Sequence, residues 1–121
     1  MPIVDIEIVL KPNETLRDDL ASELAEALGE IFDSPPGTTW VKMHPLSEVR
    51  YAENGETQKS LFPIFVKIIK SKMAGADEIQ DEVKRVTSEL ARICERPPEN
   101  VHIILEPIGS GRVAFGGKLV T

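Results

Sequence analysis

The sequence predicts an α+β fold in which a β-α-β unit occurs twice and builds a four-stranded sheet with two helices on one face. Two stretches with alternating or continuous apolar residues each precede a long amphipathic segment and a further apolar stretch. Sliding the sequence against itself by 62 residues gives 11 identities in 59 aligned pairs, several-fold more than average composition would give. We therefore expect a single domain, residues 1–121, made of two pseudo-equivalent units at about 1–60 and 61–121.

The first unit opens with a strand at residues 2–10, in which apolar residues alternate with acidic ones. Leucine and isoleucine then recur at steps of three and four, which predicts an amphipathic helix over residues 16–31. Pro35-Pro36-Gly37 ends this helix, and residues 38–43 form the next strand.

The second unit repeats this order after a polar run at residues 56–60, which reads as a linker. We expect a strand at 65–69, a helix at 77–95 and a strand at 101–105, followed by a turn at Gly116-Gly117. In each unit a helix of more than a dozen residues joins two strands, and parallel strands need a connection of that kind. The two units therefore predict one sheet with both helices on the same face.

The other face of this sheet has a mixed composition. It carries Asp5, Glu7 and Lys67 together with Ile3 and Phe65. Such a face is too apolar for open water and too polar for an ordinary core, so we expect other subunits to cover it in a closed oligomer.

Composition excludes several classes of partner and site. A net charge of −6 and a pI near 4.9 argue against nucleic acid and anionic membranes. No membrane-spanning run or signal peptide is evident, and the single cysteine, Cys94, forms no internal disulfide, so we expect a cytoplasmic protein with Cys94 in its core. We find no phosphate loop, metal-ligand spacing or nucleophile–base motif, and predict no cofactor and no metal site.

Several of these features together resemble the tautomerase superfamily. They are the strand that opens with Met-Pro-Ile, the β-α-β unit of about sixty residues, the proline-rich helix ends and the late Gly-Gly turn. The most specific pieces are Pro2, residues 96–106 and residues 112–117. The superfamily includes 4-oxalocrotonate tautomerase, malonate semialdehyde decarboxylase, the chloroacrylic acid dehalogenases and the migration-inhibitory-factor proteins. The resemblance covers essentially the whole chain and implies their fold, with two-unit chains assembled as a homotrimer.

The resemblance also implies a catalytic role for Pro2. In the superfamily the amino-terminal proline, freed by removal of Met1, acts as a general acid or base on a small enol, 2-keto acid or unsaturated carboxylate. An α-amine titrates near 8 in water, and burial or nearby cations lower that pKa. A neutral secondary amine removes a proton next to a carbonyl and returns it elsewhere, which is keto–enol tautomerisation. Isomerase activity is thus the first expectation, and decarboxylation, dehalogenation or hydration remain open.

A small anionic substrate calls for cations near Pro2. The candidates are Lys70 and Lys72, which follow the third strand, and Arg50 and Arg112, which occupy equivalent positions in the two units. Lysines that extend into solvent at a strand end, and arginines in structural or intersubunit ion pairs, are the competing interpretations.

Two aromatic residues are candidates for lining the site. The strand arginine of 4-oxalocrotonate tautomerase aligns with Trp40, and with His102 in the second unit. The aromatic residue that shields the proline in that enzyme aligns with Tyr51. Trp40 and Tyr51, the only Trp and Tyr of the chain, would keep the site dry and lower the pKa of the amine, although packing explains Trp40 equally well. The missing arginine puts activity on dicarboxylates in doubt.

Two alternatives to an enzyme follow from the same residues. One is a trimer of the same fold that binds a ligand or partner without catalysis. The other is a ferredoxin-like regulatory module, since a β-α-β-β-α-β order also fits that fold and gives Pro2 no role. Sedimentation separates them, because such modules usually pair as dimers.

Overall fold

A computed structural model describes residues 2–55 and 61–121, so the predicted linker at 56–60 lies outside the described part of the chain. The predicted α+β class is confirmed. Four strands form one mixed sheet in the order β2-β1-β3-β4. Their bounds are β1 Ile3–Val9, β2 Trp40–Leu46, β3 Ile64–Ile69 and β4 Val101–Leu105.

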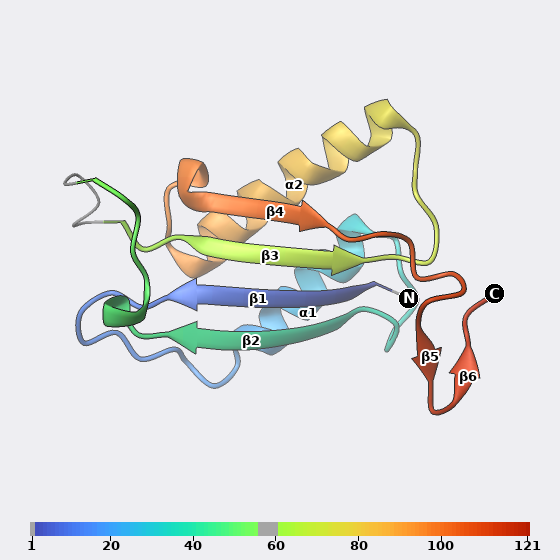
Figure 1. Cartoon of the computed structure of the whole chain (residues 1–121), viewed down its shortest axis with the longest axis horizontal. Coiled ribbons are helices and arrows are strands. Elements are labelled where there is room, and N and C mark those ends of the chain that lie inside the picture. Colours follow the sequence, from blue (N-terminus) through green and yellow to red (C-terminus); the bar gives the residue numbers. More distant parts are fainter. Residues whose placement is uncertain (1, 56–60) are drawn as a thin grey trace.

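Two helices, α1 (Leu20–Ile31) and α2 (Ala76–Cys94), cover one face of this sheet, as predicted (Figure 1). β1 pairs with β2 and β3 with β4 in parallel, while β1 and β3 are antiparallel. In a ferredoxin-like module the two strands of each β-α-β unit are split by another strand. Here β1 and β2 are direct neighbours, so that alternative is wrong. No helix of the described chain is long and apolar enough to cross a membrane.

The register of β1 and β3 relates the two β-α-β units by symmetry. Val4 lies opposite Ile68 and Ile6 lies opposite Val66. Val4 and Val66 are 62 residues apart, and so are Ile6 and Ile68. The two pairs are therefore equivalent when the units are exchanged. The two β-α-β units are therefore related by a pseudo-two-fold axis between β1 and β3, and α1 runs antiparallel to α2.

The core lies between the sheet and the helices and contains residues of both units. Its fully buried members include Val4, Ile6, Ile8, Leu24, Leu28, Val66, Val86 and Leu90. Burial of one such side chain contributes about 1.5–3 kcal/mol. Cys94 also packs in this core, as expected, and burial raises the pKa of its thiol to about 11.

Two elements differ from the sequence prediction by more than one residue. α1 begins at Leu20, and the chain before it forms turns in which the N–H of Glu14 donates to the carbonyl oxygen of Lys11 and the N–H of Leu20 to that of Arg17. β2 begins two residues late and continues through Pro45 to Leu46. A proline is tolerated there because β2 is an edge strand and needs ladder hydrogen bonds on one side only.

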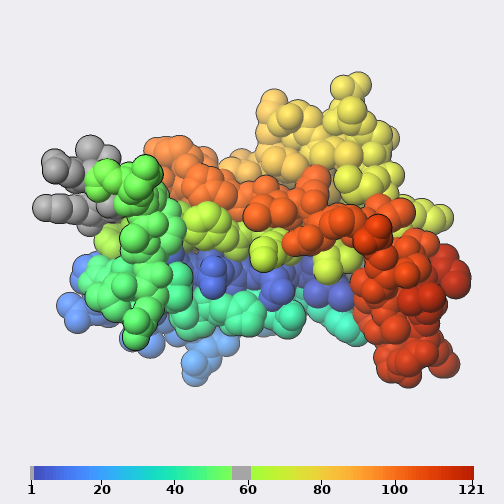
Figure 2. Space-filling view, in the orientation of Figure 1, coloured from blue at the N-terminus to red at the C-terminus, as the bar shows by residue number. Residues whose placement is uncertain are grey.

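The sheet face opposite the helices is uncovered in the single chain. Figure 2 shows this face, with the strands at the surface. Its side chains include the half-exposed Trp40 and Ile104, and an ionic cluster in which Asp5 contacts His44 at 3.0 Å and Lys42 at 3.5 Å. Lys67 lies beside Asp5 in the register. The mixed polar and apolar character predicted for this face is thus present.

A buried arginine ties the two units together at the end of the sheet remote from Pro2. The guanidinium of Arg96 donates to both carboxylate oxygens of Glu14, at 2.7 and 2.9 Å. It also donates to the carbonyl oxygens of Val9 (2.8 Å), Phe62 (2.9 Å) and Cys94 (2.9 Å). Arg96 is only 4% exposed, so these bonds satisfy a charge that would otherwise be buried without a partner.

Acid should weaken the fold through Glu14. Hydrogen bonds from Arg96 lower the pKa of Glu14 below its ordinary value of 4.5. The resulting stabilisation is complete above the ordinary pKa and is lost as the pH falls through the lowered value in the folded state. We expect the urea midpoint of the wild type to exceed that of a Glu14→Gln variant at neutral pH, and the difference to shrink on acidification. A difference that grows as the pH falls would contradict this assignment.

The chain ends in a small hairpin beside the amino terminus. Strands β5 (Ala114–Phe115) and β6 (Lys118–Leu119) pair through a turn at Gly116 and Gly117, whose φ angles are +57° and +89°. Glycine adopts this left-handed backbone without steric cost, and the predicted Gly-Gly turn is confirmed. Figure 1 shows the hairpin next to the start of β1, so it closes one side of the region around Pro2.

Candidate active site

Pro2 lines an apolar cavity between the start of the sheet and the terminal hairpin. The residue is buried and directly precedes β1. The cavity has a volume of about 210 Å³ and is lined by Pro2, Ile3, Gly37, Thr38, Trp40 and Phe115. The three parts of the chain that meet there are the strand start, the loop before β2 and the hairpin.

Trp40 holds these three parts together. Its backbone N–H donates to the carbonyl oxygen of Pro2 at 3.0 Å, and its indole Nε1–H donates to the carbonyl oxygen of Gly37 at 2.9 Å. Its ring meets Phe115 edge to face, with centroids 5.1 Å apart and planes at 81°. Trp40 is nevertheless 50% exposed, so part of its ring remains available to a ligand. The structure thus brings together the sequence-predicted residues Pro2 and Trp40.

The cavity contains no charged side chain from the described part of its own chain. Across residues 2–55 and 61–121, no group of three His, Cys, Asp or Glu residues is placed to hold a metal ion. The walls are therefore formed by apolar side chains and backbone, with the Thr38 hydroxyl as a polar group. That hydroxyl donates to the carbonyl oxygen of Pro35 at 2.7 Å.

The two candidate lysines follow β3 at the Pro2 end of the sheet but do not line the cavity. The register that pairs Ile3 with Ile69 places the backbone of Lys70 near Pro2. The ammonium of Lys70, however, forms an ion pair with Glu82 at 2.8 Å and lies 5.1 Å from the ring centre of Phe32. Lys72 is exposed.

The remaining candidates lie at different ends of the molecule. Arg112 is exposed and precedes the hairpin at the Pro2 end. Arg50 and Tyr51 lie beyond the far end of β2, whereas Trp40 begins that strand. The ring of Tyr51 contacts Phe65, with centroids 5.8 Å apart. Within one chain, therefore, Trp40 and Tyr51 do not share a pocket.

Phe115 is the main lining residue that the site prediction omitted. It directly precedes the Gly116-Gly117 turn, inside the segment 112–117 that carries the superfamily resemblance. This position could have identified Phe115 as a candidate, because an aromatic residue beside a hairpin turn is held in a fixed place. What the sequence could not show is that the hairpin folds back onto Trp40.

Chemically, the arrangement offers an apolar site directly beside Pro2. The aromatic walls exclude water and offer flat apolar surface to a substrate. The geometry can therefore hold a small molecule with an apolar body beside the backbone of Pro2.

Comparisons with known proteins identify the fold. No family model and no curated protein matches the sequence. Among solved structures, a macrophage migration inhibitory factor homologue from Prochlorococcus marinus superposes with a TM-score of 0.76 at 15% identity, covering 98% of this chain and 99% of the other. The macrophage migration inhibitory factor of Trichinella spiralis gives 0.74 at 15% identity, covering 97% and 98%.

A fused 4-OT protein, solved as a symmetric trimer, gives a TM-score of 0.78 at 10% identity and covers 98% of this chain and 94% of the other. These similarities extend over nearly the whole chain and include two of the four kinds of relative named from the sequence. The resemblance drawn from the sequence is therefore confirmed at the level of the fold, and the chain has the fold of macrophage migration inhibitory factor and of the fused 4-OT proteins.

Proposed function

We propose that this protein is an enzyme that uses the amino group of Pro2, after removal of Met1, as a general acid or base, with keto–enol tautomerisation as its reaction. The observation that carries the proposal is the burial of Pro2 in the wall of an apolar cavity at one end of the sheet. The shared fold of tautomerase-type proteins supports it.

In this mechanism the neutral amine of Pro2 takes the proton of an enol hydroxyl or of a carbon next to a carbonyl. The resulting secondary ammonium then gives a proton back at the alternative carbon or oxygen, so that no proton or electron is gained or lost overall. The apolar surroundings disfavour the charged ammonium form, which leaves the neutral amine available for the first transfer.

The cavity favours a substrate with an apolar body over a dicarboxylate. Its lining offers Trp40 and Phe115 for contact with a flat or branched apolar group, and no cation of the same chain for a second carboxylate. Lys70 is paired with Glu82, so a single carboxylate of a small 2-keto acid is best placed outside the lining, toward the exposed Lys72 and Arg112 at the same end of the molecule.

We further propose that the working form is a cytoplasmic homotrimer in which neighbouring copies cover the open sheet face. That face exposes apolar groups such as Ile104 beside the Asp5 cluster. Arg50 and Tyr51 lie at the far end of their own chain, so they reach a Pro2 cavity only if a neighbour supplies them. The trimer in which the fused 4-OT protein was solved supports this arrangement.

Ligand binding should be visible through Trp40, the only tryptophan of the chain. Its half-exposed ring forms a wall of the cavity, so a bound aromatic 2-keto acid should change its fluorescence in a saturable way. A Phe115→Ala variant should weaken this binding about tenfold, since it removes apolar contact worth about 1–3 kcal/mol. Unchanged emission at saturating ligand would place the binding site elsewhere.

A covalent probe tests the proposed role of Pro2. One structural neighbour, Pt0534, was solved after inactivation by 2-oxo-3-pentynoate. This acetylenic keto acid is an electrophile that a free secondary amine attacks. We expect one adduct per chain, located on Pro2 by peptide mapping, and protection by a competing 2-keto acid. Labelling spread over surface lysines, with none on Pro2, would refute the proposal.

The uncharged cavity also favours a second candidate, a trimer that binds an apolar ligand without catalysis. Such a protein would show the fluorescence change at Trp40 and no turnover. The covalent probe separates the two, because binding alone needs no reactive amine at Pro2.

A further inference from the structure

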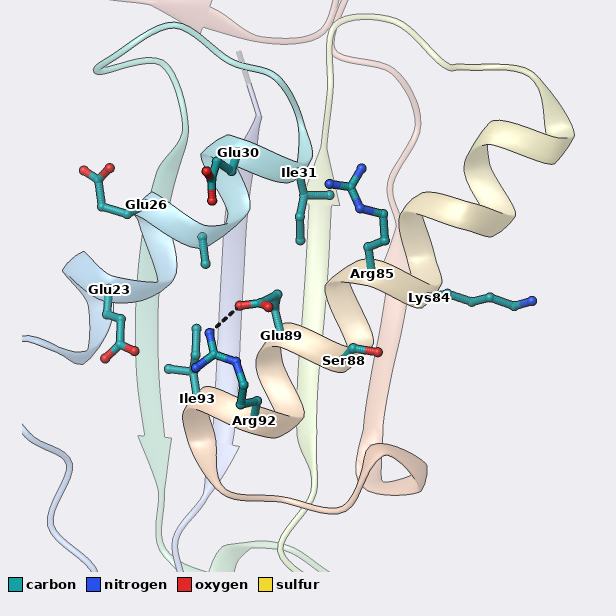
Figure 3. A pocket seen from close by; sticks show the side chains of 11 residues that line it. Glu23, Glu26, Glu30, Ile31, Lys84, Arg85, Ser88, Glu89, Arg92 and Ile93 are labelled. Atoms are coloured by element: carbon teal, nitrogen blue, oxygen red, sulfur yellow. Dashed lines mark hydrogen bonds and ion pairs between the residues drawn. The ribbon is translucent and has the colours of Figure 1, made fainter.

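The outer surface of the helix layer carries a groove between α1 and α2, on the opposite side of the sheet from its open face (Figure 3). Its volume is about 1010 Å³. The residues that form it are Glu23, Glu26, Ala27, Glu30 and Ile31 from α1, and Lys84, Arg85, Ser88, Glu89, Arg92 and Ile93 from α2. None of them lines the Pro2 cavity.

The two walls of the groove differ in charge. The acidic wall consists of Glu23, Glu26 and Glu30, which lie on one stripe of α1 at intervals of three and four residues. The basic wall lies on α2 and carries Lys84, Arg85 and Arg92 together with one carboxylate, Glu89, so that cations predominate on it. Apolar side chains of Ala27, Ile31 and Ile93 lie between the walls.

The walls compensate each other only in part within one chain, where Glu23 of α1 attracts Arg92 of α2 without forming an ion pair with it. Arg92 pairs with Glu89 of its own helix at 2.6 Å, and Glu23 pairs with Arg17 outside the groove. No ion pair crosses from α1 to α2 among the residues that the structure describes. The groove therefore keeps charges of both signs that a suitable partner can satisfy.

We propose that the groove is a self-association surface through which two copies pack helix layer against helix layer. A two-fold axis along the groove places α1 of each copy over α2 of the other, so each acidic wall faces a basic wall. Because α1 and α2 are antiparallel, Glu23 lies level with Arg92, and Ile31 at the other end of α1 lies level with Arg85 (Figure 3). The same rotation therefore brings Glu23 over Arg92 of the second copy and Glu30 near its Arg85.

The charge pattern favours this geometry over others. A two-fold axis across the groove would stack acidic wall on acidic wall, which is repulsive. The net charge of −6 per chain also opposes approach, so only the local match of the walls favours contact. Exposed pairs of this kind are screened by salt, and the association is therefore weak and dependent on ionic strength.

This surface is independent of the proposed active site and of the proposed trimer. The helices cover the sheet face away from the one that we assign to the trimer, so groove pairing joins trimers to each other. Failure of groove pairing leaves labelling of Pro2 unaffected, and failure of that labelling leaves groove pairing unaffected.

Sedimentation velocity with matched charge variants tests the proposal. The acidic-groove variant is Arg85→Glu with Arg92→Glu, and the basic-groove variant is Glu26→Lys with Glu30→Lys, which spares the contact of Glu23 with Arg17. The control is Lys118→Glu, which changes an exposed residue of β6 that is not part of the groove. Each protein is measured over a concentration series at low salt and at about 1 M salt, where the screening length is roughly 3 Å.

At low salt we expect the wild type and the control to show a mass above that of a single trimer, and at high salt to return to the mass of the trimer. Each groove variant alone should keep the mass of a single trimer. An equimolar mixture of the two variants should associate again. If the mass of the wild type does not change with concentration or salt, the proposal is overturned, and the groove would then suit a helical segment of another protein. A mixture that stays apart, or a control that fails to associate, also overturns it.

Discussion

Replacing Pro2 by alanine should lower the tautomerase rate by a factor of about 10²–10⁴, the usual contribution of a positioned acid–base group. The variant keeps a free α-amine after removal of Met1, but it loses the ring that fixes the nitrogen and the apolar contact that the ring makes in the cavity wall. The rate is followed by the ultraviolet absorbance of the enol.

The fold of this variant should remain intact, because Pro2 precedes β1 and contributes only its carbonyl oxygen to the described backbone hydrogen bonds. Circular dichroism and the urea midpoint check this. A Pro12→Ala variant is the matched control, since Pro12 lies in an exposed turn far from the cavity. A Pro2→Ala enzyme with an unchanged rate would rule out the proposed acid–base role.

Replacing Arg96 by methionine should destabilise the fold by about 3–5 kcal/mol, the typical cost of removing one partner of a buried ion pair. The guanidinium is the donor for both oxygens of Glu14 and for three backbone carbonyls, among them that of Val9 at the end of β1. Methionine fills much of the volume, so the loss reports the unpaired groups rather than a cavity. Urea unfolding measures it.

Two further variants make this result specific. An Arg92→Met change removes an exposed arginine paired with Glu89 and should cost no more than about 1 kcal/mol. Adding Glu14→Gln to the Arg96→Met variant should restore part of the stability, since it removes the carboxylate left without a partner. Equal losses for the Arg92 and Arg96 variants would show that the buried network contributes little.

The sequence alone predicted the architecture because periodicity and the internal repeat act locally. The alternation at Val4, Ile6 and Ile8 defines β1 and its buried face, and the 62-residue repeat implies the second unit and its pseudo-two-fold relation. The start of α1 was predicted too early because Leu16 fits the apolar stripe of the helix, whereas in the structure it packs against the core from the turns that precede α1.

The site was predictable in part. Pro2 and Trp40 do meet in one cavity, whereas Tyr51, which the alignment placed with them, lies at the other end of the sheet. An alignment gives equivalence of position but not which copy of the chain supplies a residue. The place of Phe115 depends on the fold-back of the hairpin, and the ion pair of Lys70 with Glu82 depends on the docking of α2.

The most direct test of the acid–base role is the intact mass of the protein expressed from its native start codon. The proposal requires a mass short by one methionine, because only then does Pro2 carry a free secondary amine. A chain that keeps Met1 has a tertiary amide at this nitrogen, which is not basic. That result would contradict catalysis by Pro2 and leave the apolar cavity as a binding site.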